Sequence, residues 1–236
     1  MKHLVIGDIH GCHSELMELI EAAGISAGDR IIALGDLIDR GPASRDVVEF
    51  FMSAPNASSV LGNHESRHVR MSKSRQAPAL EQHLTARQFD DAGYARVIEY
   101  FESLPLYIEL PEAILVHDGL GRGLPLRFRE DGDDEAASLI YGENYPGTAF
   151  PRSWYELYDG DKPVIAGHIN PGGGRAPFIY KNRVYLIDTG CCYGRALTGV
   201  LLPDFKVISV MSRRNYRSES LARANVRFDG HDSEFE

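Results

Sequence analysis

Six short apolar runs in this sequence each end in residues that can bind a metal ion or move a proton. Carboxylate oxygens, imidazole nitrogens and one amide oxygen follow the runs, and no thiolate stands among them. Such a mixed oxygen and nitrogen set suits manganese, iron, zinc or nickel better than a structural zinc held by sulfur. One junction of this kind is usually a turn, but six together predict a metal site. The runs are LVIGDIHG (4–11), IALGDLIDRG (32–41), VLGNHE (60–65), ILVHDGL (114–120), VIAGHINP (164–171) and YLIDTG (185–190).

The candidate ligands are more numerous than one metal ion requires. Two divalent ions about 3.5–4 Å apart, bridged by a carboxylate and a water, would use the whole set. A bound metal lowers the pKa of water from about 15.7 to about 7, and the resulting hydroxide can attack phosphorus in line. A histidine near the metals that is not a ligand can protonate the leaving oxygen, which contributes about 10² to 10⁴ in rate. The polar residues collected from these junctions are Asp8, His10, Asp36, Asp39, Arg40, Asn63, His64, His117 and His168.

The apolar runs predict the strands that must position these residues. Continuous runs rich in Val, Ile and Leu are typical of strands buried on both faces of an α/β protein. Ligands of such sheets bind beyond the carboxyl ends of the strands, where the polar residues would meet. Helical spacing over 14–23 and 43–52 makes the first part of the chain βαβαβ, and 64–104 is expected to be mostly helical. Later strands are predicted at 106–110, 113–116, 164–166, 178–180, 184–187, 197–202 and 206–210, with a hairpin turn at 180–183.

Length and composition favour one large domain. The chain has 236 residues, 43% of them hydrophobic, and the domain is expected to span residues 1–210. The segment 211–236 is polar, with arginines first and acids last, which predicts a flexible tail. No stretch approaches the roughly 18 apolar residues of a membrane span. Three cysteines without CxxC spacing favour a reducing cytoplasm.

The formal net charge of −9 limits the classes of partner. A protein that binds nucleic acid over a broad surface normally presents basic residues, so no stable nucleic-acid complex is expected. Small phosphorylated substrates stay compatible with this charge, because bound metal ions supply positive charge locally. The sequence leaves the oligomeric state undefined.

Several of the motifs resemble those of the calcineurin-like metallophosphoesterases. Within that family the pattern resembles the branch that contains serine/threonine phosphoprotein phosphatases and symmetrical diadenosine tetraphosphate hydrolases. The resemblance implies an α/β sandwich of two mixed β-sheets between helical layers, with a dinuclear metal site at strand ends. It also implies two divalent cofactor ions, manganese first, with iron, zinc or nickel as alternatives. The matching segments are GDIHG (7–11), GDLIDRG (35–41), GNHE (62–65), HDG (117–119), GH (167–168) and DTGCCYG (188–194).

The same resemblance implies a role for each matched residue. Asp36 would bridge the two ions, and His64, oriented by Asp39, would be the general acid. Arg40 would bind the phosphate, for which its planar guanidinium is suited. Arg152 resembles a second phosphate-binding arginine, and Tyr193 falls where relatives place an aromatic residue near the site. The first ion would be held by Asp8, His10 and Asp36, and the second by Asp36, Asn63, His117 and His168.

Two acidic residues need a separate interpretation. Glu65 ends the GNHE motif, where the family implies a supporting hydrogen bond at the turn. Asp118 stands where the family usually has glycine or alanine after the histidine. Its carboxylate would either support a neighbouring metal ligand or repel an anionic substrate.

Several functions are compatible with these motifs. We expect hydrolysis of phosphomonoesters, including phosphoserine and phosphothreonine of proteins, with symmetrical hydrolysis of dinucleoside tetraphosphates as the second hypothesis. A nuclease or cyclic phosphodiesterase is a weaker hypothesis, because the acidic chain offers little to polynucleotides. A non-catalytic binding module of the same fold is the alternative from a different class, although every expected ligand type is present.

Overall fold

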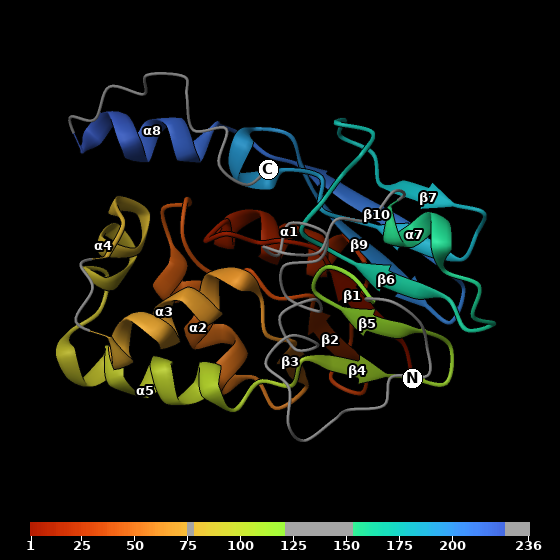
Figure 1. The fold of residues 1–236 in the computed structure, drawn as a ribbon, viewed down its shortest axis with the longest axis horizontal. Coiled ribbons are helices and arrows are strands. Elements are labelled where there is room, and N and C mark those ends of the chain that lie inside the picture. Colours follow the sequence, from red (N-terminus) through yellow and green to blue (C-terminus); the bar gives the residue numbers. More distant parts are fainter. Residues whose placement is uncertain (75–77, 121–152, 225–236) are drawn as a thin grey trace.

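The computed structural model describes residues 1–74, 78–120 and 153–224, which form two five-stranded sheets and the helices around them (Figure 1). The strand orders are β10-β9-β1-β2-β3 and β4-β5-β6-β8-β7. Both sheets mix parallel and antiparallel pairs, so the predicted fold class is confirmed. The strands are β1 His3–Ile6, β2 Arg30–Ala33, β3 Ala57–Ser59, β4 Tyr107–Glu109, β5 Ile114–Val116, β6 Val164–Ala166, β7 Phe178–Tyr180, β8 Val184–Leu186, β9 Ala196–Leu202 and β10 Lys206–Met211.

The helices follow the predicted ranges through the first hundred residues. The βαβαβ order is confirmed, and three helices occupy the stretch that was expected to be mostly helical. In Figure 1, α2, α3, α4 and α5 form a group on one side of the strands. The helices are α1 His13–Ala22, α2 Ser44–Ser53, α3 Asn63–Lys73, α4 Leu80–Ala86, α5 Asp91–Glu102, α7 Trp154–Leu157 and α8 Tyr216–Arg223, with a 3₁₀ turn, η2, at Cys191–Tyr193.

Alternating side chains on the strands divide the core into layers. On β1, Leu4 and Ile6 pack with α1, α2 and α5, whereas Val5 points to the other face and packs against the second sheet. On β5, Leu115 faces the first sheet, and Ile114 packs with Trp154 of α7 on the outer face. Successive side chains of a strand point to opposite faces, so each strand must be apolar on both sides. This explains the continuous apolar runs in the sequence.

Parallel pairing brings the polar junctions to common edges. In the first sheet, β1 pairs with β2 and β2 with β3, so Ile6, Ala33 and Ser59 lie level across the sheet. In the second sheet, β5, β6 and β8 are parallel and end level in the same way. The residues that follow these strands therefore leave the two sheets together, as parallel strand ends do in α/β folds.

The predicted hairpin between 180 and 183 is present and joins the antiparallel strands β7 and β8. Lys181 and Asn182 both have left-handed backbone, with φ of 50° and 52°. The Arg183 N–H donates to the Tyr180 carbonyl at 2.9 Å, which closes a turn with these two left-handed residues at its centre. Tyr180 pairs with Val184, so the connection has three residues. Asparagine accepts this conformation readily, so the turn forms without the usual Asn-Gly pair.

The expected flexible tail is partly wrong. Strand β10 continues to Met211, and α8 occupies Tyr216–Arg223. The Asn215 side chain caps this helix by accepting from the Ser218 N–H, and the Tyr216 hydroxyl donates to Glu15 Oε1 of α1 at 2.8 Å. Leu221 is buried beneath the helix. Residues 225–236 of the predicted tail lie outside the described residues.

None of the helices in the described part of the chain is long and apolar enough to cross a membrane.

Candidate metal centre and active site

The polar residues after six strands converge at one place between the two sheets. The first sheet contributes the loops after β1 and β2 and the start of α3, and the second contributes the segments after β5, β6 and β8. Most of their side chains are almost completely withdrawn from solvent, and two, His168 and Asp188, are partly exposed. The residues that meet are Asp8, His10, Asp36, Asp39, Asn63, His64, His117, His168 and Asp188.

Asp36 lies at the centre of this group. Its Oδ2 is 3.4 Å from His10 Nε2, and its Oδ1 is 3.4 Å from His117 Nε2. Asp8 Oδ2 lies 3.9 Å from His10 Nε2 on one side, and Asn63 Oδ1 lies 3.2 Å from His117 Nε2 on the other. One carboxylate therefore touches both groups of candidate ligands, which is the arrangement that a bridging ligand needs.

The hydrogen bonds of two histidines show that the donor set fits a cation. Nδ1 of His10 donates to the Ile38 carbonyl and Nδ1 of His117 donates to the Leu34 carbonyl, each at 2.7 Å. Burial lowers the pKa of both imidazoles, so both are neutral. Each Nε2 then carries a lone pair that faces a carboxylate oxygen of Asp36. A positive charge nearby favours two electron-rich atoms at this distance. Arg40 supplies one beside His10, and divalent metal ions match the nitrogen and oxygen ligands.

The carboxylates around Asp36 also require positive charge. Burial, together with the charges of Asp188 and Asp36, raises the pKa of Asp8 well above its usual value. Burial raises the pKa of Asp188 to about 6. Asp188 was in a recognised junction but had no predicted role, and its place after β8 beside the other carboxylates was the available signal.

Asp118 packs against a candidate ligand. Its carboxylate is buried, and Oδ2 lies 3.4 Å from Nε2 of His168. The His168 backbone N–H donates to Asp8 Oδ1 at 3.0 Å, which ties the β6 loop to the β1 loop. The contact with His168 gives Asp118 the position of a residue that supports a metal ligand.

A second network holds His64 beside the metal centre. Nδ1 of His64 lies 2.6 Å from Asp39 Oδ2, and Nε2 of His68 lies 2.9 Å from Asp39 Oδ1. Gln82 of α4 donates to Asp39 Oδ2 at 2.8 Å, and Tyr94 of α5 bonds to His68 at 2.6 Å. Burial would raise the pKa of Asp39, but the hydrogen bonds from His64 and His68 hold it well below its usual value. Asp39 is therefore a charged acceptor that fixes the ring of His64.

Sequence reasoning missed His68 and Gln82. His68 lies four residues after His64, which puts both histidines on one face of α3. That spacing was the only sequence signal for His68, and nothing local pointed to Gln82. Nε2 of His64 lies 3.9 Å from Asp36 Oδ2 and has no hydrogen-bond partner within the described ranges.

Glu65 binds the backbone of the turn, as predicted. Its Oε2 accepts from the N–H groups of Asp36 and Gly62 at 2.8 and 3.1 Å, and its Oε1 accepts from Leu37 at 2.9 Å. Burial and the charge of Asp36 raise its pKa to about 8, and hydrogen bonds from backbone N–H groups, including those of Asp36 and Leu37, oppose that shift. Glu65 thus joins the β2 loop to the first turn of α3.

Arg40 and Tyr193 line a cleft of about 480 Å³ that opens onto the metal centre. Nη1 of Arg40 lies 2.9 Å from His10 Nε2, so the guanidinium supplies positive charge beside the candidate ligands. Its carbon lies 5.4 Å from the centre of the Tyr193 ring, within the range of a cation–π contact. Both residues therefore lie beside the candidate metal ligands, and their binding of a substrate stays a prediction. The predicted Arg152 lies outside the described residues.

Five site residues have left-handed backbone, which is uncommon for residues other than glycine. The φ angles of His10, Asp36, Asp39, Arg40 and His168 lie between 47° and 69°. Each such residue costs about 1–3 kcal/mol and persists only where the surrounding structure imposes it. Non-glycine backbone strain of this kind clusters at functional sites.

Two signature glycines allow the loops to approach closely. A Cβ on Gly41 would overlap the carbonyl oxygen of His10, and a Cβ on Gly167 would overlap Asp8 Oδ1. The loops that carry His10 and Arg40, and those that carry Asp8 and His168, can therefore touch only when these two positions have no side chain.

Comparison with known proteins places this arrangement among phosphoesterases. The family model described as calcineurin-like phosphoesterase matches residues 1–207. The chain is 31% identical to a bis(5′-nucleosyl)-tetraphosphatase PrpE [asymmetrical] of Halalkalibacterium halodurans, over 93% of this chain and 97% of that one. It is 29% identical to the protein of the same description from Bacillus subtilis, over 92% and 97%.

Solved structures show the same fold. A crystal structure described as that of a candidate diadenosine tetraphosphatase aligns with a TM-score of 0.71 at 27% identity, over 89% of this chain and 93% of that one. A serine/threonine phosphatase from Saccharomyces cerevisiae aligns with a TM-score of 0.64 at 19% identity, over 91% and 80%. At that identity the second likeness is one of fold alone.

Proposed function

The chain belongs to the calcineurin-like phosphoesterases and is a metal-dependent phosphoesterase, and from this premise we propose that it hydrolyses dinucleoside tetraphosphates asymmetrically, to a nucleoside triphosphate and a nucleoside monophosphate. The observation that carries the reaction class is the buried Asp36 between two sets of ligands, with His64 and Arg40 beside it. The substrate is supported by the relatives, whose names specify a nucleosyl tetraphosphatase.

This proposal reverses the order of substrates expected from the sequence. The sequence favours phosphomonoesters as the first substrate class, and it predicts that any cleavage of a dinucleotide is symmetrical. The similar proteins named above are described as asymmetrical hydrolases, and the protein phosphatase shares the fold alone. The cleft also has aromatic residues at its edge, Tyr155 and Tyr193, and a nucleobase can stack on such rings.

We assign two divalent ions to the metal centre, with manganese as the first choice. When bound, they supply positive charge for the phosphate oxygens and acidify the attacking water. The chemistry of the ligands, neutral imidazoles with carboxylate and amide oxygens, suits manganese. The first ion would be held by Asp8, His10 and Asp36, and the second by Asp36, Asn63, His117 and His168.

In this proposal, side chains of the protein bind the phosphate and protonate the leaving group. Arg40 binds the phosphate oxygens through its planar guanidinium, which pairs well with phosphate. His64 gives a proton from Nε2 to the leaving oxygen. Asp39 accepts from Nδ1 of His64, which fixes the ring and stabilises its charged form. His68 and Gln82 hold Asp39 in place for this task.

The test compares three substrates with manganese-loaded protein: diadenosine tetraphosphate, a phosphoserine peptide and 4-nitrophenyl phosphate. Asp36→Asn serves as the blank. We expect the dinucleotide to be preferred and chromatography to show ATP with AMP. ADP as the only product would mean symmetrical cleavage, and preference for the peptide would make the protein a phosphoprotein phosphatase. Turnover of the aryl phosphate alone would reject both substrates while showing that the centre works.

A further inference from the structure

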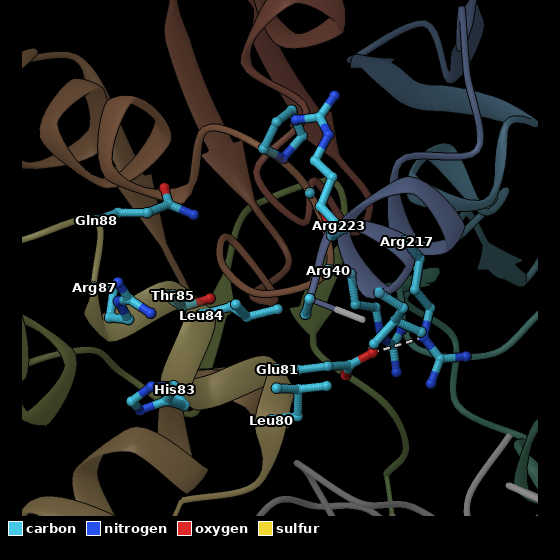
Figure 2. Close-up of a pocket in the computed structure, with 15 residues that line it drawn as sticks. Arg40, Leu80, Glu81, His83, Leu84, Thr85, Arg87, Gln88, Arg217 and Arg223 are labelled. Carbon is cyan, nitrogen blue, oxygen red and sulfur yellow. Dashed lines mark hydrogen bonds and ion pairs between the residues drawn. The ribbon is translucent and has the colours of Figure 1, made fainter. Parts of the chain in front are cut away.

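A second hollow, of about 430 Å³, lies between α4, α8 and the loop after β2 (Figure 2). Arg40 lines this hollow and also lines the cleft at the metal centre, so its side chain borders both spaces. One wall of the hollow is α8, which lies where the sequence predicts a flexible tail, so the hollow has no signal in the sequence. We call it the arginine hollow, after the residues that line it.

The charge of the arginine hollow is opposite to that of the chain. The whole sequence has 34 acidic and 25 basic residues, with a net charge of −9. The lining includes one acid, Glu81, and four arginines. Leu80, Leu84 and Leu221 add apolar wall. Clustered arginines beside apolar surface suit a ligand that has both phosphate groups and a nucleoside. The four arginines are Arg40, Arg87, Arg217 and Arg223.

Two of the arginines converge on Glu81. Arg217 Nε lies 2.6 Å from Glu81 Oε1, and Arg40 Nε lies 3.8 Å from Glu81 Oε2. Figure 2 shows Glu81 of α4 pointing toward both guanidinium groups. The same two groups lie 5.4 and 5.6 Å from the centre of the Tyr193 ring. Glu81 is thus an internal carboxylate at a point where two cations meet.

The three charged side chains remain within reach of an external anion. The exposed fractions are 17% for Arg40, 17% for Glu81 and 20% for Arg217. An ion pair that is partly open to water is weakly held, because its attraction is screened and holding long side chains costs entropy. A phosphate chain, with several charged oxygens, can compete with one carboxylate for these guanidinium groups.

We propose that the arginine hollow binds the part of the dinucleoside tetraphosphate that lies beyond the reacting phosphorus. This inference rests on the proposed function, because it assigns the second end of the same substrate. The reacting phosphate lies in the cleft, and the phosphate chain passes Arg40 into the hollow. Arg217 then binds the distal phosphates in place of Glu81, and the apolar wall contacts the nucleoside.

The first test removes one cation. Arg217→Met keeps the length of the side chain and loses its charge. We expect kcat/KM for diadenosine tetraphosphate to fall by about tenfold or more through KM, as loss of binding that is equal in ground and transition states predicts. Turnover of 4-nitrophenyl phosphate, which does not extend past Arg40, should change by less than about twofold. Arg214→Met is the matched control, because Arg214 lies three residues earlier, does not line the hollow and pairs with Glu219 at the surface.

The second test removes the internal carboxylate. Glu81→Gln breaks the same ion pair from the other side and should lower KM for the dinucleotide, because the arginines lose their competitor. If the ion pair served only to hold α4 and α8 together, both variants would raise KM for the dinucleotide. Changes of KM in opposite directions for Arg217→Met and Glu81→Gln therefore support a ligand site. Changes of KM in the same direction would overturn it.

A third measurement separates this inference from the proposed function. Titration calorimetry of ATP into the Asp36→Asn protein measures binding without turnover. The added Arg217→Met change should weaken ATP binding by about tenfold, and unchanged affinity would overturn the arginine hollow as a nucleotide site. Loss of aryl phosphate turnover in Arg217→Met by the same factor as dinucleotide turnover would also overturn it, since Arg217 would then only position Arg40. If the wild-type protein does not hydrolyse the dinucleotide, the proposed function is rejected, whatever the calorimetry shows.

Discussion

At the scale of single residues, one ring nitrogen of His64 is held in place and the other is available to a ligand. Asp39 fixes the ring through Nδ1 at 2.6 Å, and Nε2 lies 3.9 Å from Asp36 without a hydrogen-bond partner among the residues described. A side chain in this position can be a general acid or an extra metal ligand, since His10, Asp36 and His64 lie close enough together to hold an ion. The two roles predict different behaviour.

His64→Gln should lower kcat for the dinucleotide by about 10² to 10⁴, the usual contribution of a positioned general acid. The manganese content of the purified variant, measured by plasma mass spectrometry, should equal that of the wild type. Loss of one manganese ion per chain would contradict the general-acid role and make His64 a ligand.

The residues found from sequence and those missed differ for a physical reason. Asp8, His10 and Asp36 follow apolar runs, and the ends of parallel strands necessarily meet, so their convergence could be predicted. His68 and Gln82 are in helices, where a polar residue is normally solvated, and their approach to Asp39 depends on how α3 and α4 pack. Periodicity indicates a helix but not its tertiary neighbours.

At the scale of elements, the loops after β1, β2 and β6 carry the site because they touch one another. The carbonyl of His10 occupies the space where a side chain on Gly41 would lie. The GDIHG and GDLIDRG motifs therefore specify one loop packed against another, in addition to a set of ligands.

Gly41→Ala should lower the free energy of unfolding by about 1–3 kcal/mol, because the methyl group forces the two loops apart. Urea denaturation measures the change. Gly28→Ala is the matched control: no described atom lies within 4 Å of the added methyl group. That control should leave stability unchanged or raise it by about 0.4–1 kcal/mol. Equal effects of the two substitutions would show that the loops are not in contact.

Helix α8 was not predicted because its sequence has few apolar residues. YRSESLAR offers Tyr216 and Leu221 as anchors, and both depend on partners far away in the chain. Glu15 of α1 is completely buried, and its carboxylate accepts from the Tyr216 hydroxyl and from the Arg213 N–H. The polar segment by itself predicts flexibility, because the buried carboxylate that fixes it lies about 200 residues away in the sequence.

Tyr216→Phe should destabilise the protein by about 1–3 kcal/mol, because it removes a hydrogen bond from a buried carboxylate. Thermal or urea unfolding tests this. Tyr180→Phe is a suitable control, since its hydroxyl makes no hydrogen bond within the described part of the chain and should change stability little. A Tyr216→Phe protein as stable as the control would indicate that α8 contributes nothing to the fold through Glu15.

At the scale of the whole molecule, the metal centre joins the two sheets. Asp36 follows β2 of the first sheet and His117 follows β5 of the second, with 3.4 Å between the closest side-chain atoms. Carboxylates from both sheets, Asp8 and Asp188, lie nearby and repel each other. Cations at this position should therefore stabilise the packing of one sheet against the other.

Addition of manganese should raise the unfolding temperature of the protein, and chelation should lower it. A ligand at a hundred times its Kd stabilises the native state by about 2.7 kcal/mol. In Asp36→Asn most of this increase should disappear, because the carboxylate that reaches both sets of ligands is lost. Scanning calorimetry with and without manganese gives the comparison, and an equal increase in both proteins would place the stabilising ions elsewhere.

The left-handed backbone at His10, Asp36, Asp39, Arg40 and His168 has a consequence for protein engineering. Glycine, and to a lesser degree asparagine, would relieve conformational strain at each of these positions. Selection of a library for heat resistance alone should therefore enrich these two residues there and produce robust but inactive proteins. Thermostability and turnover impose opposing demands on these five positions, so stabilising changes must be sought elsewhere in the chain.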